Sequence, residues 1–115
     1  NQEIQFVYEI NGIRDVSVDS VSIGDVFKDA DTKSTLGKVI DKEVTLATMA
    51  TTDSDGEVIY SEIPNKYVMK LTFLGNGMVS DAEIKVGNTQ LQIGKLITVE
   101  SRMNRFMGVV VGIDS

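Results

Sequence analysis

The sequence predicts an all-β or β-dominated α+β fold, either a small barrel or a two-sheet sandwich. Apolar and polar side chains alternate in several short runs, which is the pattern of strands with one buried face. Ten glycines separate these runs and suggest tight turns. No segment keeps a 3.6-residue apolar period for ten residues, so long helices are not expected. With 115 residues, the chain is long enough for a single β-rich domain, residues 1–115.

The first elements are short. Residues Ile4–Ile10 alternate and predict a strand, followed by a turn at Asn11-Gly12. Residues 16–22 allow a short helical turn. Val26-Phe27 predicts a short strand that ends in a polar stretch.

The middle of the chain predicts two longer strands and a hairpin. Residues 36–46 predict a strand with a bulge between Ile40 and Val44, because the inward-facing phase shifts there. The polar residues 48–56 indicate a loop. Residues 57–63 and 67–74 then flank Pro64-Asn65 as a hairpin.

The last third predicts shorter strands. Gly75-Asn-Gly77 is expected to end the preceding strand. Residues 82–86 and 91–93 are strand candidates, and residues 96–100 and 106–113 form a closing pair.

A degenerate internal repeat suggests two pseudo-duplicated halves. Each unit reads apolar-Gly-polar-apolar, then a polar stretch, then apolar-Gly-x-Val-apolar. Gly24 and Gly37 are 13 positions apart in the first unit, and Gly94 and Gly108 are 14 apart in the second. A strand precedes each unit, so two such halves packed together would close a small barrel and protect its edges. The alternative is that short β proteins repeat Ile-Gly pairs by chance.

Composition narrows the function classes. Eleven Lys and Arg stand against seventeen Asp and Glu, a net charge of −6 that disfavours nucleic acid and anionic membrane surfaces as partners. The chain has neither cysteine nor histidine, which removes thiol nucleophiles, zinc-thiolate sites and the commonest general base. We therefore expect neither an enzyme nor a cofactor.

One acidic segment partly fits a calcium loop. Asp53, Asp55 and Glu62 would fall at the third, fifth and twelfth positions of such a loop, with Gly56 at the sixth. Thr51 stands at the first position, where aspartate is usual, and the flanks indicate strands. The alternative is a solvated Asp-Gly hairpin turn, and no metal is expected.

Two other charged groups are candidates for chemistry. Asp29 and Asp31 form a close carboxylate pair, but their polar surroundings indicate a hydrated loop. Arg102 and Arg105, beside Phe106, are the candidate ligand-binding residues, because arginine holds phosphate or carboxylate bidentately. The alternative is two solvated arginines at a hairpin tip.

Four motifs together resemble a bacterial family of unknown function, common in Gram-positive bacteria, whose members are membrane-anchored. The motifs are Val21-Ser-Ile-Gly-Asp-Val-Phe27, Leu36-Gly-Lys-Val-Ile-Asp41, Ile84-Lys-Val-Gly87 and Met107-Gly-Val-Val-Val-Gly-Ile-Asp114. The resemblance implies an N-terminal transmembrane helix and a β-rich domain outside the cell. Since the chain starts at Asn1 and holds no apolar run of about 20 residues, we expect a fragment lacking that anchor. It implies no catalytic residues, and the expected role is an interaction or assembly module with a protein partner or through self-association.

A looser resemblance links the chain to the mammalian-cell-entry type of bacterial lipid-transport domain. The stretch from Ile23-Gly24 to Ile40, followed by residues 67–74, is similar, whereas the acidic insert at 51–62 departs from that pattern. This resemblance implies the alternative function, a lipid- or hydrophobe-binding domain that forms rings.

Overall fold

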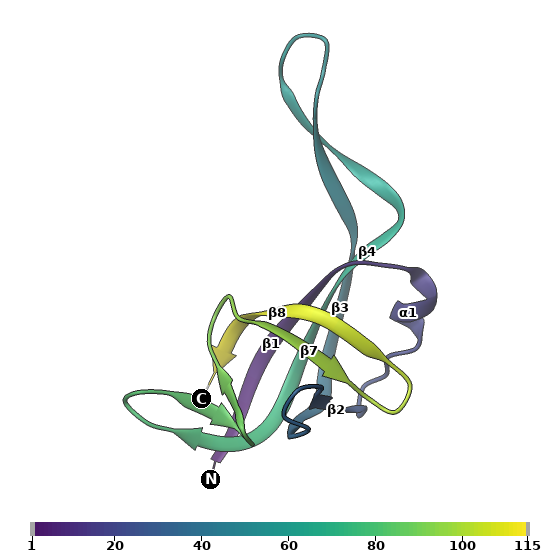
Figure 1. The fold of residues 1–115 in the computed structure, drawn as a ribbon. Coiled ribbons are helices and arrows are strands. Elements are labelled where there is room, and N and C mark those ends of the chain that lie inside the picture. The colour runs from purple at the N-terminus through teal and green to yellow at the C-terminus, as the bar shows by residue number, and fades with distance from the viewer. Residues whose placement is uncertain (1, 115) are drawn as a thin grey trace.

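A computed structural model describes residues 2–114 and confirms the predicted β-dominated fold class (Figure 1). All strand pairings within these residues are antiparallel and belong to one sheet. The elements in chain order are β1 (Gln2–Ile13), α1 (Asp15–Asp19), β2 (Val26–Asp29), β3 (Thr35–Thr52), β4 (Val58–Val79), β5 (Ile84–Val86), β6 (Thr89–Leu91), β7 (Leu96–Glu100) and β8 (Arg105–Asp114).

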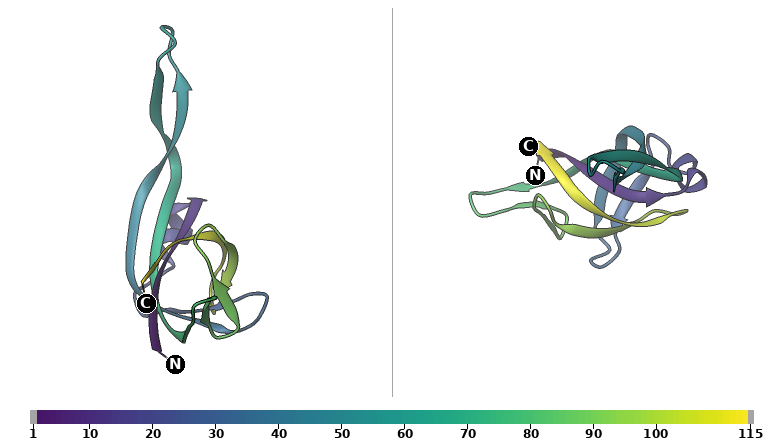
Figure 2. Two further views of the ribbon diagram at one scale, coloured as in Figure 1. Left: turned by 90° about the vertical axis from the view of Figure 1, so that its left-hand side faces the viewer. Right: turned by 90° about the horizontal axis from the view of Figure 1, so that it is seen from above.

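Six of the strands pair in a closed circuit. Neighbours follow the order β1-β8-β7-β2-β3-β4-β5-β6, and β1 also pairs with β4. The ring therefore consists of β1, β8, β7, β2, β3 and β4, and β5 with β6 forms a hairpin attached to β4 (Figure 2). Phe6 opposite Phe73 and Tyr8 opposite Leu71 set the register at the closing β1–β4 ladder.

The first repeated unit closes on itself through two backbone hydrogen bonds. The N–H of Gly24 donates to the carbonyl of Val39 at 2.7 Å, and the N–H of Val39 donates to the carbonyl of Asp25 at 2.8 Å. Gly24 has a φ of +99°, which a side-chain-bearing residue rarely adopts. The glycine in this motif is therefore required by the backbone turn that starts β2.

The second unit repeats that arrangement. The N–H of Gly94 donates to the carbonyl of Val110 at 2.8 Å, and the N–H of Val110 donates to the carbonyl of Lys95 at 3.0 Å. Gly94 has a φ of +88°. The units β2-β3 and β7-β8 thus correspond, as the repeat predicts. The strand that precedes each unit in the chain does not pair beside it: β1 pairs with β8 and β4 pairs with β3, so the two halves of the ring are β2-β3-β4 and β7-β8-β1.

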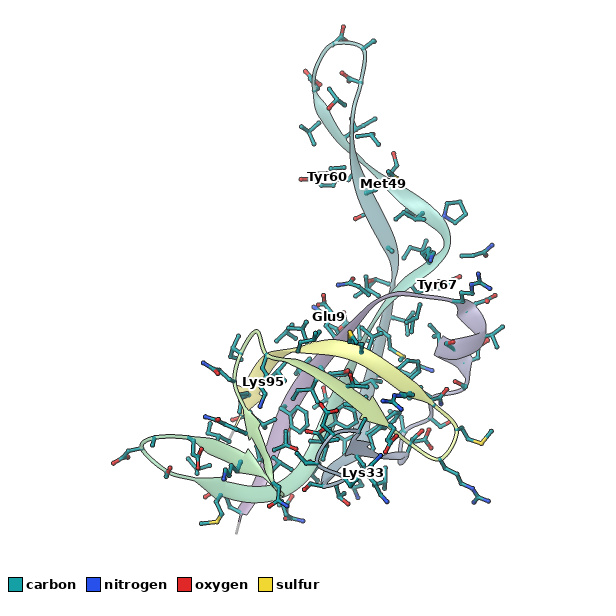
Figure 3. The ribbon with its side chains drawn as sticks, in the orientation of Figure 1. Glu9, Lys33, Met49, Tyr60, Tyr67 and Lys95 are labelled. Carbon is teal, nitrogen blue, oxygen red and sulfur yellow. The ribbon has the colours of Figure 1, made fainter. Side chains whose placement is uncertain are left out.

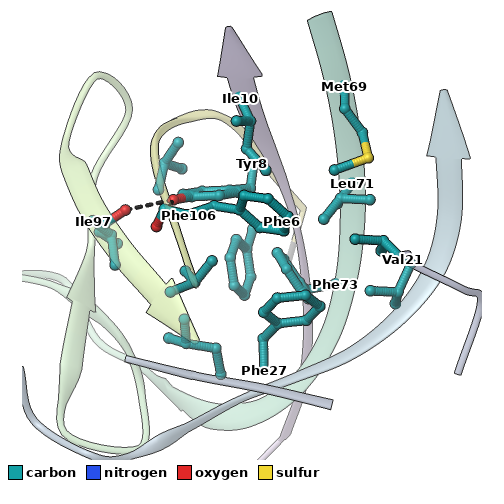
Figure 4. Close-up of a cluster of buried hydrophobic side chains, with 14 of the residues drawn as sticks. Phe6, Tyr8, Ile10, Val21, Phe27, Met69, Leu71, Phe73, Ile97 and Phe106 are labelled. Atoms are coloured by element: carbon teal, nitrogen blue, oxygen red, sulfur yellow. Dashed lines mark hydrogen bonds between the residues drawn. The ribbon is translucent and has the colours of Figure 1, made fainter. Parts of the chain in front are cut away.

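An aromatic cluster fills the ring. Phe73 contacts Phe6 and Phe27 with ring centroids 5.2 and 5.5 Å apart, and Phe27 contacts Phe106 at 6.2 Å (Figure 4). These four side chains come from β1, β2, β4 and β8 and are buried. Aromatic contacts of this kind stabilise a core beyond the area they bury, so the cluster ties both halves together.

Tyr8 links β1 to β7 across this cluster through a buried side-chain hydrogen bond. Its buried hydroxyl donates to the carbonyl of Ile97 in β7, and the carbonyl of Phe106 lies 3.3 Å away (Figure 4). Burial raises the pKa of the Tyr8 hydroxyl far above its usual value, so the group keeps its proton and remains a donor.

Two short elements flank the ring. The expected helical turn is α1, and Val18 and Val21 from this segment are buried against the core. The Lys42 ammonium group holds the segment by donating to the carbonyls of Val18 and Val21 at 2.6 and 2.8 Å. On the β5–β6 hairpin, Val86 and Leu91 are buried.

The predicted loop at residues 48–56 and the predicted hairpin at Pro64-Asn65 are wrong. Strand β3 runs on to Thr52, and β4 is one strand from Val58 to Val79, so the reversal lies at residues 53–57. Pro64 is tolerated because it sits where β4 has no outer neighbour that needs its N–H. Asn65, with φ +58°, belongs to a bulge in which residues 63–66 lie opposite Ala47 alone.

Two smaller expectations are also corrected. Asn11-Gly12 forms a bulge within β1 rather than a turn. Gly75 and Gly77 do not end a strand: β4 continues to Val79, and the absent side chains allow close backbone contact with Leu36 and Lys85. The predicted bulge of β3 lies at Ile40, the first residue of the expected interval.

Replacing Gly108 with alanine should destabilise the ring by roughly 1–3 kcal/mol. The new Cβ would lie 2.5 Å from the Glu9 carbonyl oxygen and 2.7 Å from Cζ of Tyr8. Gly112→Ala in the same strand is the matched control, because its Cβ would meet only Val7 side-chain atoms at 3.6 Å. Urea unfolding of both variants measures the difference, and equal losses of stability would contradict the close contact.

Candidate interaction surface

The outer part of the β3–β4 hairpin extends beyond the ring. We call residues 48–62 the arm; it forms a narrow two-stranded ribbon that projects from the body in Figure 1 and in the left view of Figure 2. The molecule measures 55 × 33 × 22 Å along its principal axes, so this projection makes it strongly elongated.

Side chains on the arm point to two opposite faces. Thr48, Ala50 and Thr52 pair with Glu62, Tyr60 and Val58, so these six residues share one face. Met49 and Thr51 pair with Ser61 and Ile59 on the other face. Each face thus carries apolar side chains, and neither is covered by the ring.

The apolar side chains of the arm are exposed. Tyr60 is 76% exposed, Val58 61%, Met49 51% and Ile59 45%, and the sticks of Met49 and Tyr60 lie well away from the ring (Figure 3). Exposed apolar side chains gathered on one element, rather than scattered singly, are typical of surfaces that contact another molecule. These residues contribute nothing to the core.

Both edges of the arm also lack a neighbouring strand within residues 2–114. Strand β3 pairs with β2 only through residues 35–38, and β4 pairs with β1 only from Tyr67 onward. The outer backbone N–H and C=O groups of the arm are therefore open to a partner.

The arm is acidic at its tip. Residues 44–65 contain four carboxylates and no basic side chain. Asp53 forms the turn: its Oδ1 accepts from the N–H groups of Asp55 and Glu57 at 2.9 Å each, and Gly56 adopts φ +83°. This arrangement matches the Asp-Gly hairpin turn that the sequence left open as an alternative.

The three candidate calcium ligands are not brought together. Asp53 and Asp55 lie in the turn, whereas Glu62 pairs with Thr48 at the base of the arm. At about 3.4 Å per residue, Glu62 is roughly 14 Å along the strand from Val58. Within residues 2–114, no group of three carboxylates is placed to hold a metal ion.

The two candidate arginines belong to a second charged surface. Lys28 in β2, Glu100 in β7 and Arg105 in β8 lie side by side across three strands. Lys33 donates to Glu100 at 2.8 Å, and this bond, with the charges of Arg105 and Lys28, lowers the pKa of Glu100. Arg102, in the β7–β8 loop, lines a shallow depression of about 330 Å³ together with Val26, Lys28, Glu100 and Ser101.

The predicted hydrated pair Asp29 and Asp31 is wrong for Asp29, whose residue is only 5% exposed. Its carboxylate accepts from the Thr89 hydroxyl at 2.7 Å and from the N–H groups of Asp31 and Thr32 at 2.8 and 3.3 Å. Burial alone would raise the pKa of Asp29, but these bonds and the charge of Lys95 outweigh it, so the pKa lies below its usual value. Asp29 fastens the β2–β3 loop to β6.

A closed antiparallel ring with a filled core and a projecting two-stranded arm defines a small β domain. Residues 2–114 match the family described as a domain of unknown function (DUF4330), and the chain belongs to that family. No curated protein and no solved structure matches the chain. Within residues 2–114, no helix is long and apolar enough to cross a membrane.

The sequence did not predict the arm as an extended two-stranded ribbon. Thr, Ala and Ser around an acidic turn indicated a loop, and the Val58-Ile-Tyr60 run was assigned to a hairpin around Pro64-Asn65. The available signal was the Asp-Gly pair between two runs rich in β-branched residues, which favours a hairpin centred on that pair.

Replacing Asp29 with asparagine should cost roughly 1–3 kcal/mol at pH 7, because an amide cannot accept at both oxygen positions. The native pKa lies below the unfolded value of about 3.9. The carboxylate therefore contributes its full stability above that value and loses it as the pH falls through the native pKa.

Urea unfolding of both proteins at pH 7, 5 and 2.5 measures this effect. The stability difference between the natural chain and the variant should be similar at pH 7 and 5 and should shrink at pH 2.5. A difference that stays constant down to pH 2.5 would contradict a charged, hydrogen-bonded Asp29.

Proposed function

We propose that the chain is the extracytoplasmic domain of a membrane-anchored bacterial protein and acts as a non-catalytic interaction or assembly module. The observation that carries this proposal is the arm, whose exposed Met49, Val58 and Tyr60 have no structural role in the ring. The contact itself would combine these side chains with the open strand edges.

A protein partner fits the arm better than a membrane or a nucleic acid. Insertion of the arm tip into a bilayer would carry Asp53, Asp55 and Glu57 toward anionic headgroups, which repel them. The same charges repel phosphate backbones. A protein surface with basic groups around an apolar patch would match both properties of the arm.

The placement of the chain ends supports an outward-facing arm. The start of β1 and the end of β8 lie on the part of the ring away from the arm tip (Figures 1 and 2). An anchor joined ahead of Gln2 would hold the ring close to the bilayer and present the arm away from it.

The second candidate function is binding of a lipid or another hydrophobe. The exposed apolar side chains of the arm also support this function. The ring interior is filled by Phe6, Phe27, Phe73 and Phe106, so such a ligand would lie against the arm or between several copies.

Photo-crosslinking in living cells tests the role of the arm. A photoreactive amino acid replaces Tyr60 in the full-length protein, and the matched control replaces Met78, which lies on the same strand and is 65% exposed. We expect a discrete protein adduct from position 60 and none from position 78. Equal labelling at both positions would contradict the proposal, and a lipid adduct at position 60 would favour the second candidate.

The cellular location has its own test, because the chain contains no cysteine. Asp81→Cys places one exposed thiol in the turn before β5. A membrane-impermeant maleimide should label this variant in intact cells whose outer surface is accessible to it. Labelling that requires cell lysis would place the domain inside the cytoplasm and refute the location.

A further inference from the structure

We propose that the arm of one copy docks on the basic face of a second copy, so that the chain assembles head to tail. The basic face consists of Lys28, Arg102 and Arg105 with the exposed apolar residues Val26, Met103 and Met107. This inference rests on the proposed function and names its partner as a further copy of the same chain.

The geometry of the basic face gathers positive charge and apolar surface. Lys28 and Arg105 flank Glu100 on the outer side of the ring, since Phe27, Val99 and Phe106 point inward from the same strands. Within residues 2–114, the Glu100 carboxylate is ion-paired with Lys33, and neither Arg102 nor Arg105 forms a salt bridge. The arginines therefore keep donors for an incoming carboxylate.

The arm carries the complementary pattern. Val58, Tyr60 and Glu62 share one face of β4, and Asp55 and Glu57 stand at the tip. Carboxylates would meet Lys28, Arg102 and Arg105, and the Tyr60 ring would pack on Val26 or Met103 and beneath an arginine. Elsewhere the copies repel one another, because each has a net charge of −6.

The contact has to form between copies. The arm projects away from the ring, whereas the basic face lies on β2, β7 and β8 of the ring itself (Figures 1 and 3). Two different surfaces meet in each such contact, so the copies build either an open chain or a closed ring. The smallest closed ring is a two-fold dimer in which each arm docks on the basic face of the other copy. Exposed charge pairs are individually weak, and attachment to one membrane would raise the local concentration that favours assembly.

The test is a charge swap followed by sedimentation. The arm variant is Asp55→Lys with Glu57→Lys, and the face variant is Arg102→Glu with Arg105→Glu. A third protein combines all four substitutions. The control, Asp81→Lys with Asp114→Lys, shifts the net charge by the same amount as the arm variant at exposed positions in the β4–β5 turn and at the end of β8. Thermal unfolding verifies that each variant is folded, and Arg102→Glu alone replaces the face variant if that one is not.

At low salt the natural chain and the control should associate into a reciprocal dimer or larger species, and about 0.5 M NaCl should dissociate them. Both double variants should associate at least about tenfold more weakly. The combined variant should regain association, as should a mixture of the two double variants.

Two results would overturn the inference. One is a natural chain that stays monomeric at low salt. The other is association that ignores the charge swaps, as pairing of the open strand edges would. In either case an adduct from position 60 to a different protein would leave the proposed interaction role standing, so the two failures are distinguishable.

Discussion

The ladder between β1 and β4 is the constraint on which the rest of the structure depends. It closes the circuit of strands, places Phe6 against Phe73, and brings Tyr8 within reach of β7. It also fixes how much of β4 the ring can use. Strand β1 pairs with residues 67–77, whereas β4 begins at Val58, and residues 58–62 pair only with β3. The arm is the length of hairpin that ring closure leaves without a neighbour.

The two halves of the ring have the same glycine turns and strand pairings but differ in the lengths of their strands. Gly24 and Gly94 turn the chain in the same way, and Gly37 and Gly108 pair with Phe27 and Ile97 at equivalent points of their ladders. In the first half the strands after Gly37 lengthen into the arm. In the second half the equivalent strand ends at Asp114, and the short loop before it carries Arg102. The arm is thus a place where the pseudo-symmetry is broken.

The sequence predicted the parts of the fold in which one face of a strand is buried. The alternation of Ile4–Ile10 and the paired Gly-Val motifs were sufficient for β1, β3, β7 and β8. The arm was not predicted because both of its faces are exposed, so its sequence shows no alternation of apolar and polar residues. Pro64 wrongly suggested a hairpin turn, because a strand edge without a neighbour also tolerates proline. Asp29 depends on Thr89, 60 positions away, and no local pattern carries that contact.

The bulge at residues 63–66 separates two regions of β3 and β4 that tolerate inserted residues differently. On the ring side of the bulge, β3 and β4 belong to the closed circuit of strands, so an inserted residue would turn core side chains outward. On the other side of the bulge, the two strands of the arm pair only with each other. Two residues added to each of its strands would lengthen it by roughly 7 Å and keep every side chain on its face. The length of the arm can therefore change while the fold of the ring stays the same.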